Sequence, residues 1–188
     1  DAIAAAKARG LPITCGVSAH HQTLNELGVG SCYTFRKVKP PLRSEADRMA
    51  MVEGVASGII DVVVSSHHPQ GADTKRQPFA QAAFGAIGLE TLLPAALTVH
   101  HNGDASLSDL LKTLTSNPAR ILGLDSGRLA KGAPADLMLF DPFEAFVVTP
   151  EQLHSRARNT PFDERKFEGR AYRTYVGGEC VFDRAARS

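Results

Sequence analysis

The chain has 188 residues, of which 43% are apolar and 22% are charged, an ordinary composition for a soluble globular protein. Lys and Arg number 21 against 20 Asp and Glu, which argues against a nucleic-acid-binding protein, since such proteins carry a clustered basic surplus. No apolar stretch approaches the roughly 18 residues of a membrane span, and no secretory signal is visible. The three cysteines are far apart and without CxxC spacing, which favours a reducing, cytoplasmic compartment.

The first residues predict a helix over 1–9 that ends at Gly10, because Ala favours helices and Gly commonly follows a helix end. The chain lacks an initiator Met and opens inside this helix, so we expect a piece of a longer protein. A short apolar strand over 11–18 follows, and it ends in the pair His20-His21. A helix followed directly by a buried strand is typical of a parallel βα unit.

Two further strands are predicted in this half. Residues 33–38 form a strand candidate that ends at Pro40-Pro41, and Ser44 begins a helix to about residue 56 through a capping box with Asp47. The strongest strand covers 58–66, since its Ile and Val run does not alternate, as in a strand covered on both faces.

The remaining elements suggest a change of architecture. Helices are predicted over 88–100, bent or broken at Pro94, then after Ser106 and after Asn117. From residue 125 onward short strands replace helices, at 127–129, 135–141, 146–148, 171–176 and 179–182, the last two joined by a Gly177-Gly178 hairpin. We therefore predict two units, 1–124 with consecutive βα units and 125–188 as a small β module. A closed parallel barrel needs eight units and about 250 residues, so this chain supplies only the closing part of one.

Functional residues of parallel α/β proteins cluster at the C-terminal ends of strands, where His20-His21 and His67-His68 lie. Either pair also fits a simpler interpretation in which one His packs and its neighbour is solvated. His20, His67 and His68 converge only if their strands are near neighbours, and the sequence places one strand between them. For the other histidines we expect little: His100-His101 suits a helix C-terminus, and His154 suits the surface.

Seven segments occur in one order along the chain and together resemble the second half of class I dihydroorotase, a cyclic amidohydrolase. They are 17–24, 37–43, 78–91, 117–124, 132–137, 159–162 and 176–178. The resemblance implies an α/β fold, a (β/α)8 metal-dependent hydrolase barrel with a small β-sandwich built from both chain ends. Residues 1–124 then hold barrel strands six to eight, and residues 125–188 the C-terminal strands of the sandwich.

The same resemblance implies an activity. The family hydrolyses dihydroorotate reversibly to N-carbamoyl-aspartate in de novo pyrimidine biosynthesis and uses zinc to activate a hydroxide. Most zinc ligands lie outside this chain. The resemblance also implies an oligomer, a small-molecule substrate, and aspartate carbamoyltransferase as a partner.

Individual positions follow from the matched motifs. His20 falls on a zinc ligand, Lys39 on a substrate-contacting position where the family often has Asn, and Phe84-Gly85 on a loop against the substrate ring. The family reads Thr-Asp-His-Ala-Pro-His at the last strand end, and this chain reads Ser-Ser-His-His-Pro-Gln over 65–70. The catalytic Asp therefore aligns with Ser66 and the carboxylate-binding His with Gln70. His68 is the group that can take the proton in place of Ser66.

These residues are compatible with two functions. His20 and the substrate loop favour a working zinc-dependent enzyme with an altered proton shuttle. Ser66 and Gln70 favour a catalytically inactive dihydroorotase-like subunit that serves as a structural partner of aspartate carbamoyltransferase. Allantoinase or hydantoinase fits the fold, but less well the run over 37–43.

Overall fold

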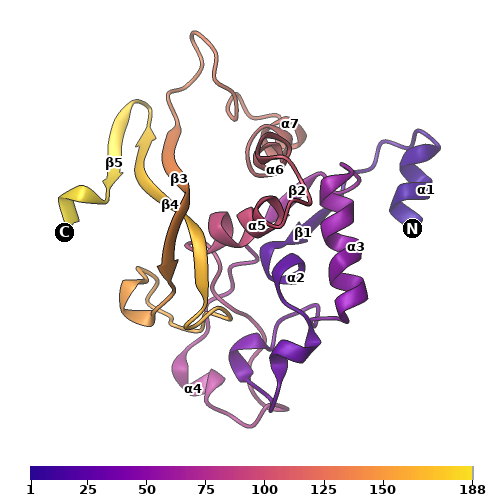
Figure 1. Ribbon diagram of the computed structural model, residues 1–188, viewed down its shortest axis with the longest axis vertical. Helices are drawn as coiled ribbons and strands as arrows, with labels where there is room; N and C mark the ends of the chain where they lie inside the picture. The colour runs from indigo at the N-terminus through magenta and orange to yellow at the C-terminus, as the bar shows by residue number, and fades with distance from the viewer. Residues whose placement is uncertain (188) are drawn as a thin grey trace.

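The computed structural model describes residues 1–187, which form two separate sheets (Figure 1). A parallel pair consists of β1 (Gly16–Ser18) and β2 (Val62–Val64), and an antiparallel sheet has the order β3 (Leu137–Val147), β4 (Lys166–Val176) and β5 (Glu179–Asp183). The α-helices are α1 (Ala2–Ala8), α2 (Ala19–Thr23), α3 (Glu45–Ala56), α4 (Ala72–Lys75), α5 (Leu92–His101), α6 (Leu107–Leu114) and α7 (Ser116–Leu122). Short 3₁₀ turns lie at Glu26–Val29, Thr34–Arg36, Pro150–Gln152 and Ala185–Arg187.

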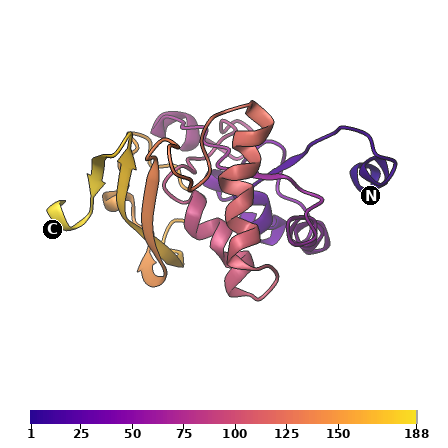
Figure 2. The same cartoon turned by 90° about the horizontal axis from the view of Figure 1, so that it is seen from above.

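Helix α5 lies between the two sheets, and α1 lies apart from the rest of the molecule in both views (Figures 1 and 2). The ammonium of Lys7 on α1 reaches the start of β2, where it lies 2.7 Å from a carboxylate oxygen of Asp61. None of the helices within residues 1–187 is long and apolar enough to cross a membrane.

The parallel pair departs from the predicted strand order. Gly16 pairs with Val62 and Ser18 with Val64, so β1 and β2 are direct neighbours. The strand predicted over 33–38 is wrong, because this segment turns through the 3₁₀ helix Thr34–Arg36. Aromatic and β-branched residues favour strands only where a neighbouring strand accepts them, and here the segment instead sends the buried Lys37 ammonium to the carbonyl oxygens of Phe79 and Ala80.

Helix caps follow the sequence closely. The hydroxyl oxygens of Ser44 and Ser106 accept hydrogen bonds from the backbone N–H groups of Asp47 and Asp109, as the two cap patterns predict. Helix α5 begins at Leu92, later than predicted, and is not broken at Pro94, because the first turn of a helix tolerates proline.

The C-terminal strands are longer and fewer than predicted. The segments 135–141 and 146–148 belong to one strand, β3, whose pairing with β4 shifts register after Leu139 and again after Asp141. Residues 127–129 form no strand. The hairpin between β4 and β5 is confirmed, with φ of 57° at Gly177 and 86° at Gly178, values that glycine adopts without strain.

One apolar cluster joins both predicted units. Helix α5 contributes fully buried Ala95, Ala96 and Leu97, and the cluster also takes in Phe162 and Phe167 from the C-terminal segment. Gly169 on β4 allows the close approach of the helix, since a Cβ atom there would lie 2.2 Å from Leu97 Cδ1. The antiparallel sheet is therefore packed directly onto α5, which also packs against α2, the helix that follows β1.

The parallel pair has a free edge on each side within residues 1–187, and several large apolar side chains are exposed, among them Leu27, Leu89 and Leu129. Unpaired edges and exposed apolar surface promote association. We predict that residues 1–188 expressed alone associate or fold poorly, measured by light scattering and urea unfolding. A monomer with a sharp, reversible unfolding transition would contradict this.

Candidate functional site

The C-terminal ends of β1 and β2 lie on the same side, because the two strands are parallel and adjacent. The chain turns directly from β1 into α2, whose N-cap Ser18 accepts a hydrogen bond from the backbone N–H of His21. This short helix buries His20, which is 1% exposed, and its ring lies 5.5 Å from that of Phe162.

His20 is neutral and keeps a free lone pair. Burial, the largest cause, and the nearby His21 and His67 together lower its pKa from the usual 6.5 to about 4, against a backbone hydrogen bond with Ile87 that raises it. Its Nε2 atom is buried with no hydrogen-bond partner. A neutral imidazole with an unpaired buried nitrogen is what a metal ligand requires, so His20 fits a metal ion.

His21 is held by structural bonds. Its Nε2 lies 2.9 Å from the carbonyl oxygen of Pro40, which can only accept, so Nε2 carries the proton. Its Nδ1 lies 2.6 Å from the hydroxyl of Ser18 and accepts from it. Both ring nitrogens are thus occupied, and within this pair only His20 is available for a ligand.

The segment after β2 carries the other predicted site residues. Ser66 is exposed and has a φ of 47°, a left-handed conformation that serine seldom adopts. His67 Nδ1 accepts hydrogen bonds from the backbone N–H groups of Gly88 and Leu89, at 3.1 and 3.3 Å. These two donors fix the His67 ring as the tautomer protonated at Nε2.

Gly88 also touches the first strand end. A Cβ atom at this position would lie 3.0 Å from His20 Nε2 and 2.3 Å from the carbonyl oxygen of Ser65. The backbone at Gly88 therefore connects His20 with the segment after β2. The expectation that a strand separates these histidines is wrong, since β1 pairs directly with β2.

His68 lies against the predicted substrate loop. Its backbone N–H donates to the Ala86 carbonyl at 2.8 Å. Gly85 has a φ of 125°, and a Cβ atom there would lie 2.9 Å from the His68 ring. His68 and the Phe84-Gly85 backbone are therefore in contact, and Phe84 keeps 46% of its surface exposed.

Asn159 links Gln70 with Gly85, since its Oδ1 accepts from the Gln70 N–H at 3.2 Å and its Nδ2 donates to the Gly85 carbonyl at 3.1 Å. Lys39 is exposed on the loop after Lys37, whose carbonyl accepts from the Gly85 N–H at 3.0 Å. The structure thus groups His68, Gln70 and the 84–85 backbone, with Lys39 on an adjoining segment.

Among residues 1–187, no group of three or more His, Cys, Asp or Glu side chains converges on a metal position. His20 is therefore the single candidate ligand that we assign in this chain. Sequence reasoning missed Gly88, Asn159 and the buried Lys75, although two of them lie in the matched segments 78–91 and 159–162. Nothing in the sequence indicates that Lys75 is buried, because a lysine in a polar loop is usually exposed to solvent.

The remaining histidines have structural surroundings. His101 Nε2 lies 2.9 Å from the Pro142 carbonyl oxygen, which joins α5 to β3. His100 Nδ1 lies 3.1 Å from the Ala105 carbonyl oxygen. His154 is largely exposed and pairs with Glu90, in line with its expected place on the surface.

Comparison with known proteins assigns the family. A model described as "Amidohydrolase family" matches residues 1–181. The chain belongs to the amidohydrolase family. As expected for such a hydrolase, its parallel βα part is consistent with a fragment of a TIM-barrel fold.

Two curated amidohydrolase relatives carry the name dihydroorotase. The protein of Anaplasma phagocytophilum is 43% identical over 182 residues, 97% of this chain and 41% of its own length. The protein of Ehrlichia canis is 45% identical over 177 residues, 94% of this chain and 40% of its own length. The chain thus spans about two fifths of these relatives.

The solved L-hydantoinase (dihydropyrimidinase) from Arthrobacter aurescens superposes with a TM-score of 0.91 at 28% identity, covering 97% of this chain and 42% of that one. A dihydropyrimidinase from Brevibacillus agri gives 0.89 at 21% identity, over 96% and 41% of the two chains. The second likeness concerns the fold alone.

The neutral state of His20 predicts a pH dependence of stability. Because its folded pKa of about 4 lies below the unfolded 6.5, only the unfolded state takes up the proton as the pH falls between these values. In the full-length, metal-free protein we expect the free energy of unfolding to drop by roughly 3 kcal/mol over that range through this group. Urea unfolding at several pH values measures it, with His20→Gln as the comparison; equal slopes for both proteins would contradict the prediction.

The close approach at Gly88 predicts a steric effect. Gly88→Ala forces the backbone away from Ser65 and crowds His20 Nε2, so we expect a loss of about 2–4 kcal/mol in the free energy of unfolding. Gly71→Ala is the matched control, since a Cβ atom there meets only Thr74 Oγ1 at 4.0 Å. Similar unfolding curves for the two variants would be inconsistent with this packing.

Proposed function

We propose that the protein to which this chain belongs is a dihydroorotase-like cyclic amidohydrolase, which hydrolyses dihydroorotate reversibly to N-carbamoyl-aspartate in de novo pyrimidine biosynthesis. The observation that carries the proposal is the 43% and 45% identity with dihydroorotases over nearly the whole chain. The buried, unpaired Nε2 of His20 supports it independently. Under this proposal the protein is a cytoplasmic oligomer.

The proposed architecture has two parts. Residues 1–124 form the closing portion of the barrel, with β1 and β2 among its strands six to eight. Residues 125–188 supply β3, β4 and β5 to a composite β-sandwich. The shared apolar cluster around α5 is consistent with these parts packing as neighbours.

We assign His20 as the ligand that this chain gives to zinc. Zinc when bound supplies Lewis-acid activation of the cyclic amide and lowers the pKa of water. The low pKa of His20, about 4, keeps its imidazole neutral across the physiological range. Gly88 lies directly beside Nε2, and because it has no Cβ atom it does not crowd that nitrogen, which a Cβ would approach to 3.0 Å.

Substrate contacts are assigned to the group around the loop. Phe84 offers an exposed ring and Gly85 a backbone that approaches closely, so a flat heterocycle can lie against them. Gln70 donates a hydrogen bond to the substrate carboxylate from its side chain, and Lys39 brings the positive charge that Gln70 lacks.

Proton transfer is assigned to His68. Hydrolysis forms a C–O bond at the amide carbon, breaks the ring C–N bond and moves a proton from water to the departing nitrogen. A Ser66 hydroxyl is not a base near neutral pH, whereas an imidazole can take and return a proton. His68 is exposed and contacts Gly85, the backbone that we assign to the substrate.

The alternative is an inactive dihydroorotase-like subunit that acts as a structural partner of aspartate carbamoyltransferase. Ser66 favours it, because it carries no carboxylate at the position where the resemblance places the catalytic Asp. A hydantoinase or allantoinase activity is the third candidate, favoured by the likeness to L-hydantoinase.

The deciding experiment is a hydrolysis assay on the full-length protein, purified without a carbamoyltransferase and supplied with zinc. We expect turnover of dihydroorotate that a chelator abolishes, and little turnover of hydantoin or allantoin. His68→Ala should lower kcat about 10²-fold or more, the usual effect of losing a general acid–base group. His154→Ala is the control, a histidine on the surface.

Other outcomes select the alternatives. Absence of turnover by folded, zinc-loaded protein supports the inactive subunit, and activity gained by the double variant Ser66→Asp, Gln70→His would then locate the loss. Unchanged kcat in His68→Ala would refute the proton-transfer assignment while leaving the substrate assignment in place.

A further inference from the structure

A lysine that the catalytic assignments do not use lies at the centre of the substrate loop. Lys75 on α4 is 0% exposed, and its Nζ donates to the carbonyl oxygens of Ala83, Gly85 and Lys37 at 2.9, 3.0 and 3.4 Å. All three partners are backbone groups. Burying an ammonium among uncharged carbonyls is costly, and the three hydrogen bonds offset part of that cost.

Three hydrogen bonds converge on Gly85. Its carbonyl accepts from Lys75 and from Asn159 Nδ2, and its N–H donates to the Lys37 carbonyl. Lys75 also donates to that same Lys37 carbonyl, which closes a ring of contacts. The N–H and carbonyl groups of Gly85 are therefore both held by hydrogen bonds to buried residues.

The fixed backbone lies directly against His68. A Cβ atom on Gly85 would lie 2.7 Å from the His68 carbonyl oxygen, so only glycine lets the loop backbone approach His68 this closely. The position of the loop and the position of His68 are thus coupled by contact.

A second lysine fixes the aromatic ring of the loop. Lys37 Nζ lies 4.6 Å from the centroid of the Phe84 ring and donates to the Phe79 carbonyl at 2.6 Å. A cation over an aromatic face stabilises that ring orientation. Phe84 is still half exposed, and the Lys37 ammonium contacts one face of its ring.

We propose that Lys75 is a positioning residue for substrate: its ammonium holds the Phe84-Gly85 backbone against His68, in the place that receives the ring of the cyclic amide. The inference rests on the proposed function and adds a residue to it. A single ammonium suits the task because it offers three N–H donors to three converging carbonyls, whereas methionine fills a similar volume with none.

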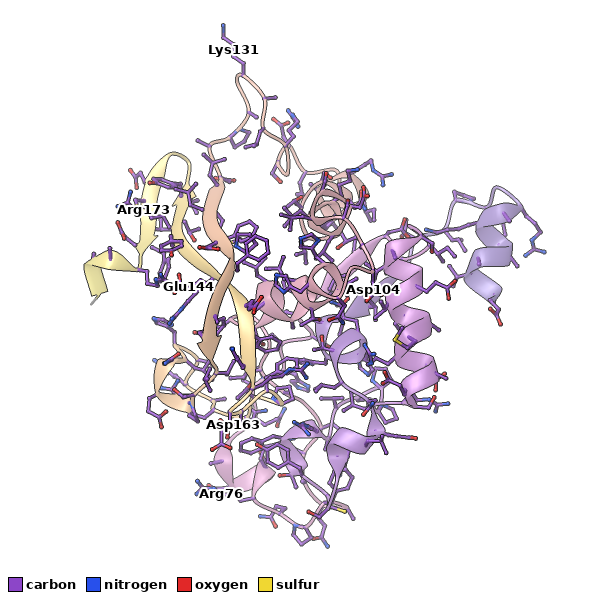
Figure 3. The ribbon with its side chains drawn as sticks, viewed as in Figure 1. Arg76, Asp104, Lys131, Glu144, Asp163 and Arg173 are labelled. Carbon is purple, nitrogen blue, oxygen red and sulfur yellow. The ribbon has the colours of Figure 1, made fainter. Side chains whose placement is uncertain are left out.

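The test is Lys75→Met in the full-length protein, assayed with dihydroorotate. We expect KM to rise about tenfold or more with a smaller change in kcat, the pattern of lost substrate binding. Amide hydrogen exchange should accelerate over residues 79–87 and remain unchanged in α5. Lys131→Met is the matched control, because Lys131 lies at the tip of the projecting loop before β3 (Figure 3).

Asn159→Ala provides a second variant, since it removes the other donor to the Gly85 carbonyl, and it should raise KM in the same direction. Wild-type KM and exchange in Lys75→Met would overturn the proposal, as would a lowered Tm with exchange raised throughout the chain. If the wild-type protein shows no turnover, the proposed function fails, and exchange over 79–87 in the two lysine variants still decides whether Lys75 holds the loop.

Discussion

The direct parallel pairing of β1 with β2 is the constraint on which the candidate site depends. Because Gly16 pairs with Val62 and Ser18 with Val64, both strands end at the same level. His20, in the first turn after β1, then meets the segment that follows β2, and the two are joined through the backbone at Gly88. A strand between them would move that segment away from His20 by a further strand spacing of about 4.8 Å.

Around this pairing, the site is organised by close backbone contacts. Gly88 and Gly85 occupy positions where a Cβ atom would touch His20 and His68 respectively. The two N–H groups that donate to His67 Nδ1 belong to Gly88 itself and to Leu89. The tautomer of His67 and the position of the loop beside His20 and His68 therefore depend on the same backbone. A substitution at either glycine is expected to affect several of these side chains.

The C-terminal segment takes part in the site as well. Asn159 reaches from the region before β4 to Gln70 and Gly85, and Phe162 packs against the His20 ring. Both lie beyond residue 125, where the sequence predicts the start of the β module. The shared apolar cluster under α5 explains how that segment can be placed so firmly.

Local signals in the sequence determined the helix caps at Ser44 and Ser106, the hairpin at Gly177-Gly178 and the strand nature of β2, because each depends on residues within a few positions. The family resemblance also brought His20, Ser66, His68 and the 84–85 loop forward as candidates. The place of those residues in the reaction stays a prediction.

Tertiary structure alone decided which segments meet. The turn at 34–36, the direct contact of β1 with β2 and the distinction between His20 and His21 depend on partners that lie far away in sequence, among them the Pro40 carbonyl. Lys75 shows this most clearly. Its sequence context is that of a solvated lysine, and only the folded loop surrounds its ammonium with three carbonyl oxygens, since hydrogen-bond partners separated along the chain are brought together only by folding.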